Sequence, residues 1–207
     1  MNLPRRSGFA LLAAVLVATA VAQPGRDAAA LLNSQRIAQV FGSYGVEILE
    51  ADDRVRVSSL YSEEAGSRTT RTFAIVSFDD GAGESLSREQ EAIINGGSIG
   101  ETLASFGWVV EKRHRYLGLL PSTSRVESLM RLASDTMLAV HIYDLHVERS
   151  GNSHDYATIV EIHHPGYLGL DDLFEIYGST IASGKAASML RLAWRKMNVS
   201  SLGRGDR

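Results

Sequence analysis

Two charged side chains, Arg56 and Glu161, lie in stretches whose alternating or β-branched residues predict β-strands. Ala157, Ile159 and Glu161 fall on one strand face, because successive strand residues point to opposite faces. A lone carboxylate on such a partly apolar face is costly unless it is paired. A buried arginine–glutamate site is therefore one interpretation of these residues. The others are a structural ion pair and two unrelated, exposed side chains.

Five of the six histidines lie in the predicted hairpin of residues 137–164, where a metal site has to be considered: His141, His146, His154, His163 and His164. Adjacent strand residues point to opposite faces, so His163 and His164 cannot both bind one ion without a bulge. His141 and His146 also fall on opposite faces. The chain has no cysteine and neither an HxH nor an HExxH spacing. The sequence therefore predicts solvated or hydrogen-bonding histidines, with no metal site and no cofactor.

A glycine-rich segment, residues 96–100, precedes a predicted helix and resembles an anion-binding helix N-terminus. It does not follow a strand, which disfavours a nucleotide-binding site. Ser98, with Glu101 three residues later, instead fits a capping box, in which the two side chains bond the backbone of the first helical turn. The sequence favours this structural interpretation.

A basic cluster, Lys112, Arg113 and Arg115, lies in a predicted strand of residues 108–119. These residues alternate between faces, so the cluster predicts a solvated sheet edge rather than a site for a polyanion. Near the C-terminus, apolar residues alternate with basic ones from Leu190 to Lys196. This amphipathic helix is expected to pack on the domain, and contact with a membrane surface or a protein partner is the alternative.

Composition excludes several classes of protein. The chain has 207 residues, of which 44% are hydrophobic, and this is enough for one globular domain with a sizeable core. The absence of cysteine excludes disulfides, thiol nucleophiles and cysteine-ligated metal centres. A net charge of −3 provides no basic field for nucleic acid.

The first 22 residues predict a secretory signal peptide. Arg5 and Arg6 form a positive start, an uncharged apolar run extends from Phe9 to Val21, and small residues precede Gln23. The run is shorter than the roughly 20 residues of a membrane-spanning helix. We therefore expect cleavage between Ala22 and Gln23, a periplasmic or secreted protein without a transmembrane segment, and one mature domain from 23 to 207.

The remaining pattern predicts an α+β fold. Helical periodicity covers 27–44, 86–94, 98–106, 124–132, 171–177 and 185–197, and strand patterns cover 46–49, 55–61, 69–78, 108–119, 137–149 and 154–164. The last two strands form a hairpin closed by residues 150–153. Runs of antiparallel strands with separate helices predict a six-stranded antiparallel sheet with helices packed on it, built from one helix-plus-three-strand unit used twice. Residues 168–199 form a C-terminal helical extension, followed by a polar tail.

This order of elements resembles the chorismate lyase-like fold, the superfamily of chorismate pyruvate-lyases and of effector-binding domains of bacterial repressors. The similarity extends from about residue 33 to 168. Five short segments carry it: 33–49, the arginine-containing strand 56–60, the strand 71–75, the small-residue turn and helix 97–103, and the final strand 159–165 with Glu161 four residues before a proline.

The resemblance implies a site. In it Arg56 binds a substrate carboxylate, for which the planar guanidinium is well suited. Glu161 faces it across the sheet, Arg71 is a second carboxylate contact, and Ile99 and Gly100 supply a backbone N–H and an apolar wall. In the lyases, such a site expels pyruvate and leaves 4-hydroxybenzoate.

Three functions are compatible with these observations. The first is an exported protein that binds a small carboxylate or aromatic acid on a chorismate lyase-like scaffold. The second is a chorismate pyruvate-lyase-like enzyme with Arg56 and Glu161 as catalytic residues. The third is a ligand-free periplasmic interaction module that uses the C-terminal helix. Export favours the first, because chorismate is an intracellular intermediate.

Overall fold

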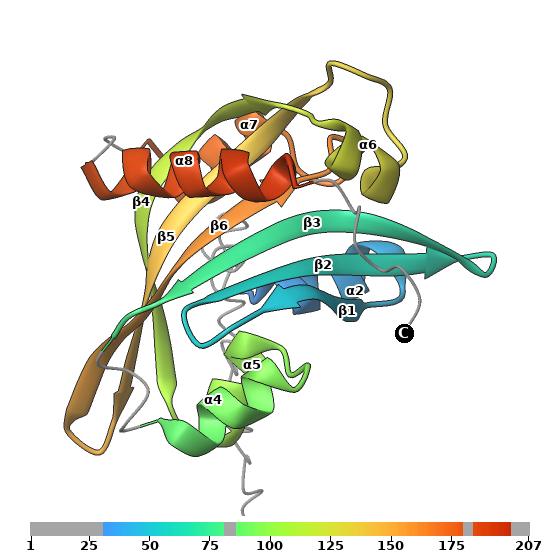
Figure 1. Cartoon of the computed structure of the whole chain (residues 1–207). Helices are drawn as coiled ribbons and strands as arrows, with labels where there is room; N and C mark the ends of the chain where they lie inside the picture. Colours follow the sequence, from blue (N-terminus) through green and yellow to red (C-terminus); the bar gives the residue numbers. More distant parts are fainter. Residues whose placement is uncertain (1–30, 81–85, 180–183, 200–207) are drawn as a thin grey trace, which may run out of the picture.

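A computed structural model of the chain describes residues 31–80, 86–179 and 184–199, so the expected signal peptide lies outside the described residues. The described elements, in chain order, are α2 (Asn33–Phe41), β1 (Gly45–Ala51), β2 (Val55–Glu64), β3 (Ser67–Phe78), α4 (Ser87–Ile94), α5 (Ile99–Ser105), β4 (Val109–Pro121), α6 (Ser124–Met130), β5 (Met137–Arg149), β6 (Asn152–His163), α7 (Leu170–Tyr177) and α8 (Gly184–Met197) (Figure 1). Within these ranges no helix combines the length and apolar character needed to cross a membrane.

The six strands form one antiparallel sheet in the order β1-β2-β3-β6-β5-β4. The first three strands form one meander and the last three form another, and the two meanders join where β3 pairs with β6. This confirms the predicted α+β class and the six-stranded antiparallel sheet with packed helices. Strands β1 and β4 are therefore the edges, and Pro121 ends an edge strand, where its missing N–H interrupts no ladder.

Alternation along the strands divides the core between the two faces of the sheet. One face packs against α6 and α8 and buries Phe73, Ile142 and Ile162 against Met189 and Ala193 of α8. The other face is covered by α4 and α5 over one part and by α7 over another. Figure 1 shows α6 and α8 on the opposite side of the sheet from α4 and α5.

The C-terminal helix α8 is part of this core. Its Ala186, Met189, Ala193 and Met197 are buried, whereas Trp194 is 43% exposed. The helix therefore packs on the domain as expected, and its contact with a protein partner stays a prediction.

Two elements differ locally from the expected boundaries. Helix α2 begins at Asn33, where the side chain of Gln35 accepts a hydrogen bond from the Leu32 N–H, and residues 27–30 of the predicted helix lie outside the described residues. The β5–β6 turn is two residues long, not four. Ser150 and Gly151 have φ values of 53° and 82°, so both are left-handed, which matches a tight hairpin turn to the twist of its strands.

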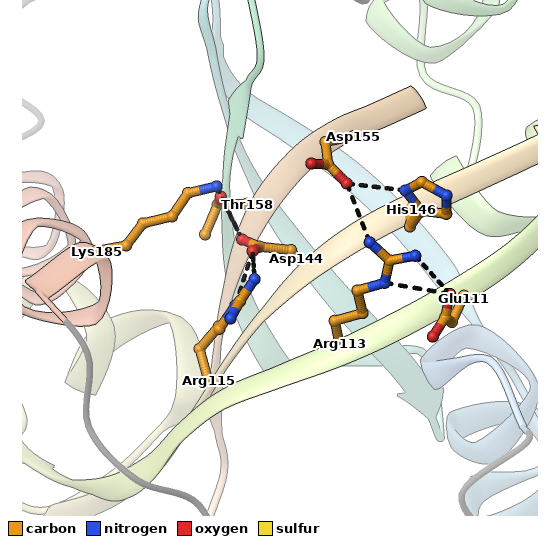
Figure 2. A network of polar contacts seen from close by, with 8 residues as sticks. All are labelled: Glu111, Arg113, Arg115, Asp144, His146, Asp155, Thr158 and Lys185. Carbon is orange, nitrogen blue, oxygen red and sulfur yellow. Dashed lines mark hydrogen bonds and ion pairs between the residues drawn. The ribbon is translucent and has the colours of Figure 1, made fainter. Parts of the chain in front are cut away.

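A polar network on the α8 face links β4, β5, β6 and α8 (Figure 2). The buried Asp144 carboxylate accepts hydrogen bonds from Thr158 at 2.8 Å and Arg115 at 2.8 Å, and it lies 3.0 Å from the Lys185 ammonium. Burial acts to raise the pKa of Asp144, but the hydrogen bonds from Thr158, Lys185 and Arg115 outweigh it. The pKa of Asp144 is consequently below its ordinary value.

Replacing Asp144 with asparagine is expected to lower the free energy of unfolding by about 1 kcal/mol at pH 7, because two half-exposed cations lose their counter-ion while Thr158 keeps an acceptor. The folded-state pKa is depressed, so this stabilisation is present above the unfolded pKa of about 3.9 and is lost as pH falls through the folded value. Denaturant titrations at pH 7 and pH 3 measure both effects. Asp155→Asn, at an exposed position in the neighbouring group of contacts with Arg113 and His146, is the control and should change stability by less than about 0.5 kcal/mol. An equal loss for Asp144→Asn at both pH values contradicts the assignment.

Candidate functional site

A pocket lies on the sheet face opposite α8, between the strands and the first turns of α2 and α5. The volume of the pocket that the centres of water molecules can occupy is about 70 Å³. The walls are mainly apolar side chains from the sheet. Nine polar or charged side chains also line it: Asn33, Ser34, Tyr44, Arg56, Ser58, Ser98, Lys112, Tyr143 and Glu161.

Strand register places Arg56 and Glu161 on this one face. Arg56 pairs with Val76, and Val76 pairs with Ile159. Glu161 lies two residues beyond Ile159 and therefore on the same face, one row along the sheet. The structure thus brings together Arg56, Glu161, Ile99 and Gly100, four of the five residues expected at the site.

Arg56 is 2% exposed, and its guanidinium has three neutral acceptors. Nε donates to Ser58 Oγ, and Nη1 donates to the carbonyls of Ile93 and Gly97, each at 2.8 Å. Among the described residues no carboxylate lies within 4.0 Å of it, and no acceptor bonds to Nη2. Burial lowers the pKa of Arg56, partly offset by Tyr44 and Tyr156. An arginine remains charged under these conditions, so the pocket wall carries a buried, uncompensated positive charge.

The fifth expected residue, Arg71, does not line this pocket. Its guanidinium pairs with Glu64, donates to Ser62 Oγ at 2.8 Å and lies 3.7 Å above the Phe41 ring. These contacts hold the Arg71 side chain between β2, β3 and α2.

Ile99 and Gly100 form the start of α5, where this helix meets α2. A Cβ on Gly100 would lie 2.6 Å from Leu32 Cδ2, so the glycine permits the close approach of the two helices. The capping box expected here is absent. Ser98 makes no side-chain capping bond, and the Glu101 carboxylate instead accepts a hydrogen bond from Ser34 of α2 at 2.8 Å. The interhelical contact thus replaces the local one.

Glu161 is fixed by one of its two oxygens. Oε1 accepts hydrogen bonds from Asn33 Nδ2 at 3.1 Å and from the Tyr143 hydroxyl at 3.2 Å. Burial raises the pKa of Tyr143 well above its ordinary value, so the hydroxyl is a stable donor. Oε2 lies 3.9 Å from both His141 Nδ1 and His163 Nε2.

The sequence predicts that Lys112 lies at a solvated edge, but its side chain lines the pocket. Nζ lies 5.0 Å from the centre of the Tyr143 ring, and among the described residues no carboxylate is within 4.0 Å of it. Burial lowers its pKa, Glu161 acts in the opposite direction, and Arg36 adds to the lowering. Its neighbour Arg113 does fit the expectation, because it is exposed and pairs with Glu111. Alternation along the strand places Lys112 and Arg113 on opposite faces of the sheet, but it does not show which face is covered by helices.

The histidines divide as alternation predicted: His163 is 1% exposed, and His164, on the other side of the strand, is half-buried. What alternation did not show is that His141 of β5 pairs in register with Glu161, on the face that also carries His163. Burial lowers the pKa of His163 to about 4 and the pKa of His141 well below its ordinary value. Both rings are therefore neutral near pH 7.

Comparisons with known proteins give little information about this site. No family model and no curated protein matches the chain. Among solved structures, the chain is similar to the C-terminal domain of YurK from Bacillus subtilis, with 11% sequence identity and a TM-score of 0.38, over 61% of this chain and 91% of that one. What the pocket binds is therefore inferred from its own side chains.

Proposed function

We propose that this chain is a binding protein for a small carboxylate, held in the pocket by Arg56 and Lys112. The observation that carries the proposal is the buried Arg56 guanidinium without a carboxylate partner among the described residues. Buried charges in proteins are normally paired, because desolvating an unpaired ion is costly. An anionic ligand would provide the missing partner, and Nη2 retains two N–H groups to bind it.

Lys112 provides a second positive charge on the same pocket. Arg56 and Lys112 outnumber Glu161, the one carboxylate among the described residues that line this cavity, and neither cation forms an ion pair with it, so the cavity favours an anion over a neutral or cationic ligand. The lowered pKa of Lys112 fits this arrangement, since an anion beside the ammonium would stabilise its charged form.

The size and chemistry of the walls define the ligand further. One water molecule occupies about 10–15 Å³ by this measure, so the pocket has room for a ligand of only a few heavy atoms without rearrangement. The wall contains apolar strand residues together with Tyr44, Ser58 and Ser98, which carry hydroxyl groups. This mixture fits a compact carboxylate with a short, partly hydroxylated body.

Calorimetric titration of the full chain with acetate, propionate, lactate and 4-hydroxybenzoate tests the proposal. We expect a compact carboxylate to bind, lactate to bind more tightly than propionate, and Lys112→Met and Arg56→Lys each to weaken binding at least tenfold. Arg113→Met, the adjacent exposed residue, should leave the affinity unchanged. The absence of binding for every acid, or equal affinity in all variants, overturns the proposal.

A lyase activity is the second candidate, and the shared location of Arg56 and Glu161 in one pocket favours it. In a chorismate pyruvate-lyase-like reaction, Arg56 would hold the carboxylate and Glu161 would approach the ether oxygen. Chorismate is much larger than the present space, so turnover requires the pocket to open. Release of 4-hydroxybenzoate from chorismate that disappears in Glu161→Gln would establish the enzyme, whereas binding without release supports the binding protein.

We further propose that the protein is exported. The charged start, apolar run and small residues of the first 22 positions support this. The full-length chain expressed in a bacterium should be recovered from the periplasm or medium with Gln23 at its N-terminus, as measured by intact-mass analysis. Recovery of the unprocessed chain from the cytosol would contradict the proposal.

A further inference from the structure

Beside the pocket, behind the Glu161 carboxylate, three buried side chains converge on one point. His141 of β5 and Glu161 and His163 of β6 each present one potential ligand atom, and these three atoms lie within 4.8 Å of one another. His141 Nδ1 and His163 Nε2 are each 3.9 Å from Glu161 Oε2. All three side chains are at most 6% exposed.

The two imidazole nitrogens that point to this centre have no hydrogen-bond partner. Within the part of the chain that the structure describes, they are the two buried side-chain polar atoms in this condition. Buried polar atoms are nearly always bonded, so each exception needs a physical explanation. Here both exceptions converge on the same carboxylate oxygen.

The opposite end of each of these side chains is hydrogen-bonded. His163 Nδ1 is 3.0 Å from Thr72 Oγ1, His141 Nε2 is 2.8 Å from His114 Nδ1, and Glu161 Oε1 accepts from Asn33 and Tyr143. Such outer partners fix the tautomer and orientation of metal-binding side chains. With Nδ1–H of His163 and Nε2–H of His141 donating to these partners, both inward nitrogens carry lone pairs.

Ring packing holds the two histidines in place. The His141 ring stacks on Tyr177 at a centroid distance of 4.3 Å, and the His163 ring meets Tyr167 edge-on at 5.9 Å. Tyr167 in turn donates to Asn33 at 2.6 Å, which links the ring packing to the hydrogen bonds around Glu161. Both rings are therefore positioned before any ligand arrives.

We propose that His141 Nδ1, His163 Nε2 and Glu161 Oε2 form a binding site for a divalent transition-metal ion, with Zn²⁺ as the first candidate. Two imidazoles and one carboxylate are a ligand set for Zn²⁺ and for other first-row divalent ions. Metal–ligand bonds of 2.0–2.1 Å place tetrahedral ligand atoms about 3.3 Å apart. The present separations of 3.9 Å to the carboxylate oxygen therefore require a contraction of about half an ångström.

The site is independent of the carboxylate proposed for the pocket. Glu161 borders both, but the metal ligands come from the far side of its carboxyl group, and neither histidine lines the pocket. Metal binding without carboxylate binding would support the metal site and contradict the proposed function. Carboxylate binding without metal binding would support the proposed function and contradict the metal site.

The test uses the untagged full chain, treated with a chelator and then titrated with Zn²⁺ by calorimetry and with Co²⁺ by visible absorption. We expect one equivalent of metal, an increase in thermal unfolding midpoint on Zn²⁺ addition, and nitrogen–oxygen ligation of Co²⁺, since the chain has no cysteine. His163→Gln and His141→Gln should each weaken binding at least tenfold.

The matched control is His164→Gln, at the adjacent position on the other side of the strand, which should bind like the wild type. If a histidine variant does not fold, Glu161→Gln is measured in its place, because it preserves the shape of the carboxyl group. A wild-type chain that binds neither ion stoichiometrically, or binds them as the histidine variants do, overturns the proposal. In that case a trapped water molecule satisfies the two nitrogens.

Discussion

Replacing Arg56 with methionine is expected to lower the free energy of unfolding by about 3 kcal/mol, because a buried, multiply hydrogen-bonded charged group is lost. The guanidinium donates to the carbonyls of Ile93 and Gly97, which lie at the connection between α4 and α5. Methionine fills the space of the side-chain stem, but it leaves both oxygens without this donor. The connection that supplies one wall of the pocket should therefore loosen.

Urea titration at pH 7 measures this loss. Arg56→Lys, which keeps the charge but loses the planar fork, should recover about half of it. Arg54→Met, at an exposed position in the turn just before the same strand with a 3.7 Å pair to Asp80, should change stability by less than about 0.5 kcal/mol. A loss below about 1 kcal/mol for Arg56→Met would show that the carbonyls do not depend on the guanidinium, and its role would then be confined to the ligand.

The sheet could be predicted from sequence because its strands carry their own pattern. Residues 69–78 are rich in β-branched and aromatic side chains, as expected for a central strand buried on both faces, and β3, Ser67–Phe78, contains this range and begins two residues earlier. The same periodicity placed Glu161 on an inward face. Its place in the same pocket as Arg56, however, depends on the strand order β2-β3-β6, which the alternation of residues does not determine.

The rest of the site depends on the register of the strands and on which helices cover each face of the sheet, and alternation determines neither. His141 and His163 meet only because β5 and β6 pair so that His141 is opposite Glu161. Lys112 lies on an edge strand, where a basic residue is usually solvated, and it lines the pocket because α2 and α5 cover that face. Arg71 has the residue type and strand expected of a ligand contact, but its partners, Glu64 and Ser62, lie along β2.

The opposite sign is expected for Lys112→Met, which should raise the free energy of unfolding by about 2 kcal/mol at pH 7. Arg56 has three acceptors, whereas no hydrogen bond or ion pair joins the Lys112 ammonium to any described residue. Its burial therefore costs stability that a methionine of similar length does not. Thermal unfolding should show a midpoint several degrees higher. Arg113→Met, next to it and exposed, should leave the midpoint nearly unchanged.

The pH dependence of stability tests whether the charge of Lys112 causes the expected difference between Lys112→Met and the wild type. Its folded-state pKa is below the unfolded value of about 10.4, so the full penalty is present below the folded pKa and stability rises with pH between the two values. The advantage of Lys112→Met should consequently be smaller at pH 10 than at pH 7. A variant that is less stable than the wild type at pH 7 contradicts the unpaired ammonium. A variant that is more stable but no longer binds a carboxylate shows that the wild-type chain retains a destabilising charge at the position where its ligand needs one.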